Sequence, residues 1–112
     1  MPCLKIKTNH RVSSQNDFMA KAAQAVCSIL KKPERVMMVT LEDEVGILFA
    51  GNRKPAVYME LKGIGLDDAL TAELSAALCA LVAEILNIPG ERVYVVFEDV
   101  QAKMWGVNGT TF

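Results

Sequence analysis

The second residue of the chain has the most distinctive chemistry. Initiator methionine is removed when a small residue follows it, so Pro2 is expected to begin the mature chain as a secondary amine. A free α-amino group titrates near about 8, and an apolar pocket with a nearby cation lowers that pKa because both disfavour the charged form. A neutral amine can accept a proton at physiological pH, so Pro2 is a candidate general acid/base. If Met1 is retained, the Pro2 nitrogen is an amide and this chemistry is lost.

Two further features could bind an anion. Lys32 precedes Pro33 at the expected end of a helix, where its ammonium group could hold a substrate carboxylate. The simpler alternative is a solvent-exposed lysine that interacts favourably with the helix dipole. Gly63-Ile64-Gly65 lies between an expected strand and an expected helix, so its backbone N–H groups could contact an anion, although such a turn needs glycine in any case.

The three cysteines do not form a metal-binding pattern. Cys3, Cys27 and Cys79 are odd in number and far apart, without a C-x-x-C motif or a histidine at ligand spacing. They are therefore expected to be reduced thiols, with neither a disulfide framework nor zinc. No residue pattern indicates a cofactor.

Composition argues against several classes of partner. The 12 Lys and Arg residues and 13 Asp and Glu residues give a formal net charge of −1, without the basic field that attracts nucleic acid or anionic lipid. Acidic residues interrupt the apolar-rich stretch 66–88, so it is not expected to cross a membrane. The chain opens without a basic and apolar leader, which favours a cytoplasmic location.

The elements that must position these residues fall into two similar units. Alternating or apolar runs predict strands at 2–8, 35–41, 56–62 and 92–98, with a short additional piece at 46–50. Apolar residues at helical spacing predict one helix that follows Ser14 and ends near Lys32, and another that follows Asp67 and ends near Asn87. Each unit therefore reads strand, helix, strand.

This order of elements predicts an α+β fold in a single domain, residues 1–112, built from two β-α-β halves. Glu34-Arg35-Val36 recurs as Glu91-Arg92-Val93, 57 residues later, which supports a tandem repeat. Because β-α-β crossovers are right-handed, both helices are expected on one face of a four-stranded mixed sheet.

The second face of that sheet predicts self-association. The strands at 35–41 and 92–98 look apolar on both faces, whereas the two helices can cover only one. An exposed apolar sheet face would exceed what a monomer usually tolerates, so we expect a homo-oligomer.

Several of these features together resemble the macrophage migration inhibitory factor family and its sister, D-dopachrome tautomerase, in the tautomerase superfamily. The ordered set that carries the resemblance is Pro2, Lys32-Pro33, Gly63-Ile64-Gly65, Arg92-Val93-Tyr94, and Gly106 with Asn108 through Phe112. The resemblance implies a homotrimer whose sheets wrap into a barrel-like assembly, with active sites between subunits. It also implies a keto–enol tautomerase that acts on phenylpyruvate-like α-keto acids.

The resemblance further implies a role for each matching residue. Pro2 would move the proton between carbon and oxygen, while Lys32 and the Ile64 backbone would hold the substrate carboxylate or carbonyl. Tyr94 would reach in from a neighbouring subunit. Val107 and Phe112 would cover the substrate ring.

Three positions depart from the family pattern. Val96 replaces an asparagine two residues after the tyrosine, which removes a polar contact from the site. Val107 replaces a tryptophan, and Trp105 stands two positions earlier, so the aromatic wall is rearranged. Residues 56–59 lack the C-x-x-C motif of the cytokine, so thiol oxidoreductase activity is expected to be absent. These departures count against dopachrome turnover and cytokine-receptor binding, whereas the proline-based tautomerase chemistry is expected to be retained.

Two other functions remain open at this point. The chain could be a cytokine mimic or interaction protein with a vestigial pocket, which binds a receptor after leaderless secretion. Alternatively, the same proline could serve decarboxylation or dehalogenation, but relatives with those activities need extra arginines around the proline that this sequence does not show.

Overall fold

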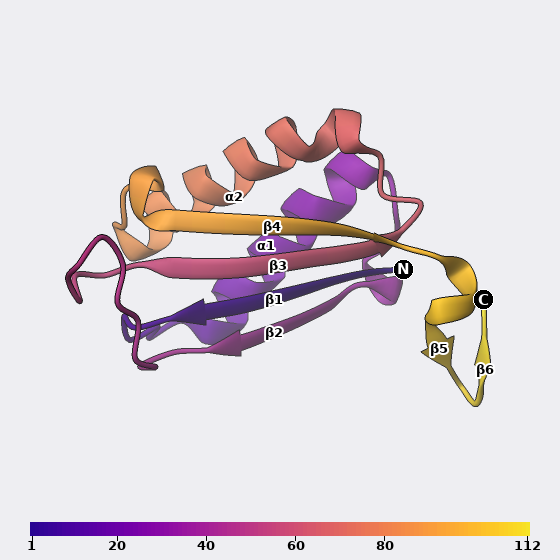
Figure 1. The fold of residues 1–112 in the computed structure, drawn as a ribbon, viewed down its shortest axis with the longest axis horizontal. Helices are drawn as coiled ribbons and strands as arrows, with labels where there is room; N and C mark the ends of the chain where they lie inside the picture. Colours follow the sequence, from indigo (N-terminus) through magenta and orange to yellow (C-terminus); the bar gives the residue numbers. More distant parts are fainter.

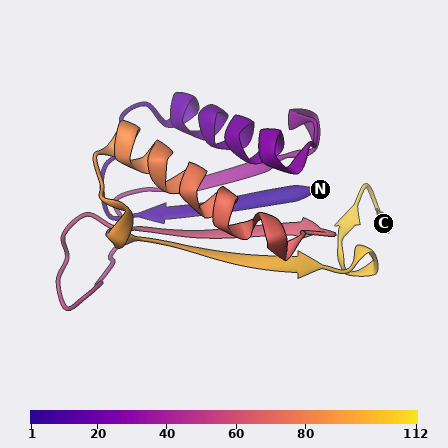
Figure 2. The ribbon, with the colours of Figure 1, turned by 90° about the horizontal axis from the view of Figure 1, so that it is seen from above.

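The structure, a computed structural model that describes residues 1–112, is a mixed sheet with two helices packed on one face (Figures 1 and 2). The sheet has the order β2-β1-β3-β4, where β1 pairs parallel with β2 and antiparallel with β3, and β3 pairs parallel with β4. The strands are β1 (Pro2–Thr8), β2 (Met38–Glu42), β3 (Val57–Ile64) and β4 (Val93–Val100). The helices are α1 (Gln15–Leu30) and α2 (Thr71–Leu86). The predicted α+β architecture is confirmed.

Short turns and a terminal hairpin complete the chain. The 3-10 turns are η1 (Glu34–Val36), η2 (Asp68–Leu70), η3 (Gly90–Arg92) and η4 (Ala102–Met104). A two-stranded hairpin of β5 (Gly106–Val107) and β6 (Thr110–Thr111) ends the chain, beyond the end of the sheet at which β1 begins (Figure 1).

The two halves repeat the same backbone device. Both helices have 16 residues, and they begin 56 residues apart, at Gln15 and Thr71. Each ends at a left-handed residue, Lys31 with φ 56° or Asn87 with φ 56°, and a proline followed by a 3-10 turn then leads into the next strand. The two 3-10 turns, at 34–36 and 90–92, are also 56 residues apart, whereas the sequence echo has an offset of 57. Val36 therefore ends η1, while its echo Val93 already begins β4.

Three element boundaries differ from the sequence prediction. The strand predicted at 35–41 begins only at Met38, because η1 occupies the preceding residues. The piece predicted at 46–50 is not a strand and forms only an isolated bridge between Phe49 and Asn52. Strand β3 continues through Gly63, because that residue pairs with Pro2 of β1.

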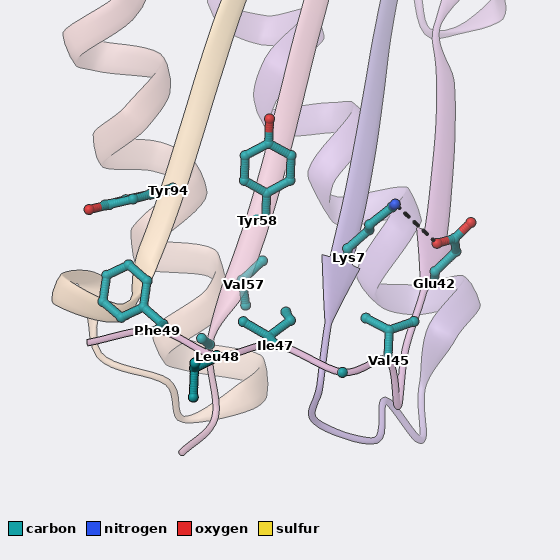
Figure 3. A pocket seen from close by; sticks show the side chains of 11 residues that line it. Lys7, Glu42, Val45, Ile47, Leu48, Phe49, Val57, Tyr58 and Tyr94 are labelled. Atoms are coloured by element: carbon teal, nitrogen blue, oxygen red, sulfur yellow. Dashed lines mark ion pairs between the residues drawn. The ribbon is translucent and has the colours of Figure 1, made fainter. Parts of the chain in front are cut away.

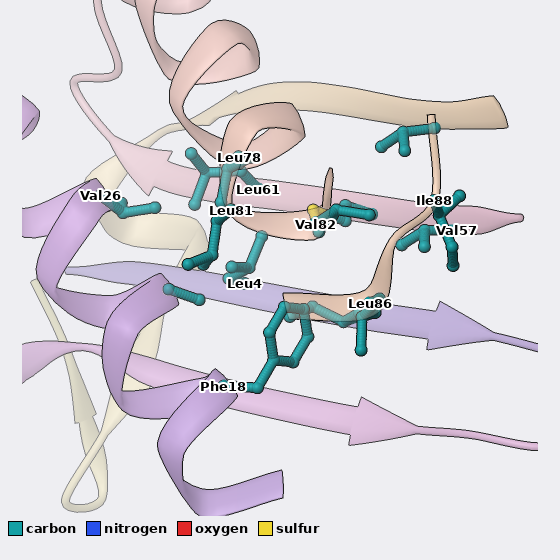
Figure 4. Packing of buried hydrophobic residues seen from close by; sticks show 14 of the residues in the cluster. Leu4, Phe18, Val26, Val57, Leu61, Leu78, Leu81, Val82, Leu86 and Ile88 are labelled. Atoms are coloured by element: carbon teal, nitrogen blue, oxygen red, sulfur yellow. The ribbon is translucent and has the colours of Figure 1, made fainter. Parts of the chain in front are cut away.

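The core lies between the sheet and the two helices (Figure 4). Leu4 of β1 and Leu61 of β3 pack against Phe18 of α1 and Leu78 of α2, and all four are fully buried. The stretch Asp68–Leu86 is long and apolar enough to cross a membrane by length and composition alone, with a mean hydropathy of 1.8, which the sequence analysis did not expect. Its buried leucines line the core of this fold, which is a sufficient reason for that composition.

The open face of the sheet is less apolar than the sequence analysis expected. Lysine and glutamate alternate across it, with ion pairs between Lys7 and Glu42 at 3.7 Å and between Lys62 and Glu98 at 3.9 Å. The prediction that β2 and β4 are apolar on both faces is confirmed only in part, since the face away from the helices carries Thr40 and Glu98 as well as the apolar Met38, Tyr94 and Val96. Exposed apolar side chains such as Met38 remain, but they lie on β2 and β4, the two edge strands.

Removing a core side chain tests this packing. Leu78→Ala is expected to lower the free energy of unfolding by about 2–5 kcal/mol, because the helix cannot collapse fully into the cavity that is left. Urea unfolding at one fixed protein concentration measures the change. Met104→Ala, at a side chain that is 77% exposed, is the control and should stay within about 0.5 kcal/mol of the parent. Equal effects in the two variants would contradict the assigned core.

Candidate active site

Three of the predicted site residues meet in one cavity at the N-terminal end of β1. Pro2, Lys32 and Ile64 line a space of about 180 Å³. Gly63, Gly65 and the side chains of Leu30, Leu66 and Leu70 complete most of its wall. The cavity therefore combines a buried proline, a cation and an apolar surface.

Strand pairing places Pro2 in this cavity. Pro2 is buried and lies opposite Gly63 in the antiparallel β1–β3 ladder. A Cβ at Gly63 would lie 3.7 Å from Leu66 Cβ and 4.0 Å from the Met1 carbonyl oxygen, so glycine leaves room beside the N-terminus. Gly65 then turns the chain with φ +69°, a conformation that favours glycine.

Two aspartates hold the chain that follows this turn. The Leu66 N–H donates to Asp99 Oδ1 at 3.0 Å, which ties the turn to β4. The Ala69 N–H donates to Asp67 Oδ1 at 2.9 Å, so Asp67 caps η2, as the sequence analysis predicted for the helix start. Asp67 also lines the cavity and is its one acidic residue.

The end of α1 presents Lys32. The left-handed conformation of Lys31 closes the helix, and the Lys32 N–H donates to the Cys27 carbonyl at 3.0 Å. Pro33 prevents the helix from continuing. Lys32 thus lines the cavity. It differs from a lysine that only caps a helix, because it lies close enough to the N-terminus to lower the pKa of the Met1 amine.

The electrostatics of the N-terminus follow from this arrangement. Burial, and secondly the positive charge of Lys32, hold the pKa of the Met1 α-amino group below its usual value of 8.0, while the Cys27 thiol opposes the shift. Burial, together with Glu34, raises the pKa of Cys27, which keeps that thiol protonated. The surroundings of the N-terminus therefore favour the neutral form of the Met1 amine. The sequence analysis expected a lowered pKa for the amine of Pro2, and for that residue it stays a prediction.

Tyr94 lies away from this cavity. Pro2 is in register with Gly63 and Asp99, whereas Tyr94 is in register with Tyr58 and Lys7, five residues along β4 and about 16 Å away. Tyr94 lines a larger, mainly apolar cavity of about 490 Å³ at the opposite end of the sheet (Figure 3). Burial, together with Glu60, raises the pKa of Tyr58 in the same cavity above its usual value. One chain therefore does not unite Pro2 and Tyr94.

Val107 and Phe112 also lie outside the Pro2 cavity. Both are on the C-terminal hairpin, where the Phe112 N–H donates to the Trp105 carbonyl at 3.3 Å. Their side chains are 43% and 45% exposed. Trp105 instead lines a small depression beside Cys3 and Lys62.

Sequence reasoning missed the apolar residues that shape the two cavities. Leu30, Leu66 and Leu70 belong to the wall around Pro2, and the helical spacing of Leu70 was a signal for burial rather than for a site. Val45 to Phe49 form one wall of the Tyr94 cavity, and the apolar run 47–49 without a pairing strand could have indicated it.

Comparison with known proteins agrees with this fold. The family model described as macrophage migration inhibitory factor (MIF) matches residues 1–112. The chain belongs to the MIF family. It is 32% identical to a macrophage migration inhibitory factor homolog of Brugia malayi over 100% of this chain and 99% of that protein.

Solved MIF structures superpose closely on this fold. A macrophage migration inhibitory factor homologue from Prochlorococcus marinus has a TM-score of 0.93 and 36% sequence identity, and covers 98% of both chains. The macrophage migration inhibitory factor from Trichinella spiralis has a TM-score of 0.91 and 30% identity, over 98% of this chain and 99% of that one. The resemblance that the sequence analysis stated is confirmed, and so is the tautomerase fold.

The influence of Lys32 on the N-terminal amine of this MIF-family chain can be measured directly. In the chain that begins with Met1, Lys32→Gln is expected to raise the pKa of the α-amino group, because a positive charge that disfavours protonation is removed. NMR titration of the labelled terminal residue reports the shift. Lys31→Gln removes a neighbouring charge that does not line the cavity, so it should change this pKa less. A larger shift in the Lys31 variant would refute the role of Lys32.

Proposed function

We propose that this protein is a keto–enol tautomerase that acts on phenylpyruvate-like α-keto acids, with Pro2 as the general acid/base after removal of Met1. One observation carries the proposal: Pro2, Lys32 and the Gly63-Ile64-Gly65 turn share a cavity in which burial and Lys32 lower the pKa of the neighbouring Met1 α-amino group. Membership of the MIF family, in the tautomerase superfamily, supports the reaction class.

The residues of the cavity suit the parts of such a substrate. The ammonium group of Lys32 holds the substrate carboxylate, and the apolar side chains of Leu30, Ile64 and Leu70 face its ring. The neutral Pro2 nitrogen accepts a proton from the carbon next to the ketone and returns it to the oxygen, which yields the enol. The reverse sequence regenerates the ketone, so atoms and charges balance without a cofactor.

Separation of Pro2 and Tyr94 within one chain supports a homotrimer with sites between subunits. A cyclic assembly brings the Tyr94 end of one sheet to the Pro2 end of the next. The exposed apolar residues on β2 and β4 favour contact through the sheet edges, because those edges have unpaired backbone groups. Val107 and Phe112, on the exposed hairpin, are available to cover a substrate ring at such a junction.

Replacing Pro2 tests the reaction. Pro2→Gly is expected to reduce kcat/KM for phenylpyruvate by about a hundredfold or more, because a flexible primary amine replaces the fixed secondary amine. Ultraviolet absorbance of the enol–borate complex measures the rate, and intact mass shows whether Met1 has been removed. A species that retains Met1 should also be inactive. Full activity of Pro2→Gly with an unchanged oligomer would falsify the proposal.

Oligomeric state and subunit mixing test the shared site. Light scattering should give three times the chain mass of 12.2 kDa. Pro2→Gly and Tyr94→Ala should each have low activity alone, whereas co-refolded mixtures should recover part of it, because some junctions then join a native Pro2 to a native Tyr94. A monomer mass at all concentrations, or no recovery on mixing, contradicts an intersubunit site.

A further inference from the structure

We infer that Arg92 is a positioning residue that holds Phe49, and through Phe49 sets the direction of Tyr94. The inference rests on the proposed function, in which Tyr94 serves the site of a neighbouring subunit. Arg92 itself lies at the end of η3, away from the Pro2 cavity, and does not line it.

The guanidinium of Arg92 is bound to one short segment of the chain. Its Nε donates to the Pro55 carbonyl at 2.8 Å, and Nη2 donates to the Lys54 carbonyl at 2.9 Å. Nη1 and Nη2 both lie 3.4 Å from the Phe49 carbonyl oxygen. One planar fork thus contacts both ends of the loop between Phe49 and Pro55.

The same guanidinium also lies over the Phe49 ring. Its central carbon is 5.0 Å from the ring centroid, within the range of a cation–π interaction. The Phe49 ring in turn meets the Tyr94 ring edge to face, with centroids 4.9 Å apart and an interplanar angle of 77°. Arg92, Phe49 and Tyr94 therefore form a continuous row of contacts, and Figure 3 shows the two rings at the edge of the larger cavity.

Asn9 also holds the end of this loop that leads into β3. Its Nδ2 donates to the Arg53 and Lys54 carbonyls at 3.2 and 3.1 Å, and the Ala56 N–H donates to Asn9 Oδ1 at 2.9 Å. Residues 43–56 contain no strand, only the bridge between Phe49 and Asn52 around a turn in which Ala50 and Gly51 have positive φ. Arg92 differs from Asn9 in that its hydrogen bonds reach Phe49 itself. Without them, the Phe49 ring loses its fixed position and Tyr94 loses its packing partner.

The consequence for the proposed site is specific. Tyr94 is 59% exposed, and its aromatic contact within the chain is the edge-to-face pair with Phe49, which restricts its direction. A Tyr94 that samples several directions binds substrate less well, because ordering the side chain then adds to the cost of binding. Proton transfer at Pro2 is unaffected, so the defect should appear in KM and not in kcat.

Arg92→Lys is the decisive variant. Lysine keeps the charge but cannot contact several carbonyls and a ring face with one planar group. We expect KM for phenylpyruvate to rise about fivefold with kcat within about twofold of the parent. In a Tyr94→Ala background the same substitution should change KM by less than about twofold, because the side chain through which Arg92 acts is already gone.

Two controls separate positioning from general destabilisation. Arg53→Lys makes the same chemical change within the loop that Arg92 contacts, at an exposed side chain that takes no part in the contacts between Arg92, Phe49 and Tyr94, and should leave KM and kcat unchanged. A purely structural role of Arg92 would lower thermal stability and active fraction equally in the presence and absence of Tyr94. Equal KM increases in both backgrounds, or no increase at all, overturn the inference.

A readout without catalysis distinguishes this inference from the proposed function. Nuclear Overhauser contacts between the Phe49 and Tyr94 rings should be strong in the parent protein and weak in Arg92→Lys. Their persistence in the variant overturns the positioning role, whatever the activity. If the parent protein lacks tautomerase activity while the ring contacts depend on Arg92, the proposed function fails and the positioning of Tyr94 stands.

Discussion

The antiparallel pairing of β1 with β3 is the constraint on which the rest of the structure depends. It is the only ladder that joins the two β-α-β halves directly in the sheet, since β2 and β4 pair only within their own halves. Its first step sets Pro2 opposite Gly63. Pro2 is thereby buried beside the turn that leads into the second half, next to the half-buried Met1. The cavity forms because β1 begins, and β3 ends, at the same end of the sheet, although the two strands are distant in sequence.

Burial and charge both lower the pKa of the Met1 amine at this end of the sheet. Desolvation is the larger cause of the lowered amine pKa, and Lys32 is the second. A cation beside an amine is unfavourable when both are protonated, and the exposure of Lys32 to solvent weakens that repulsion. In the proposed function, the same charge becomes favourable when a substrate carboxylate enters the cavity. Lys32, the second cause of the lowered amine pKa, would then also bind the substrate.

Much of the fold and part of the site could be predicted from residue patterns. Period-two and helical spacing located every main strand and helix, and Pro2, Lys32 and Ile64 lie together as expected. The open sheet face could not be judged from apolar content alone, because Glu42 and Glu98 point to the same side as the exposed Met38. Tyr94 could be linked to the site only by family resemblance. Within one chain it lies five residues along β4 from Asp99, the residue in register with Pro2. The loop at 46–50 depends on Arg92, a contact across more than 40 residues that no local pattern reveals.

The left-handed helix end, with the proline and 3-10 turn that follow it, occurs in both halves but has a different role in each. After the left-handed residue that ends α1 comes Lys32, which is exposed and lines the cavity; after its counterpart at the end of α2 comes Ile88, which is buried in the core. The sequence echo likewise pairs the exposed Arg35 with Arg92, and only Arg92 has a loop and an aromatic ring to bind. Chemistry and packing are thus divided between halves of the same shape: the first supplies the amine and the cation, and the second holds the tyrosine. An assembly that joins unlike ends of neighbouring copies is the simplest arrangement in which both contributions act on one substrate.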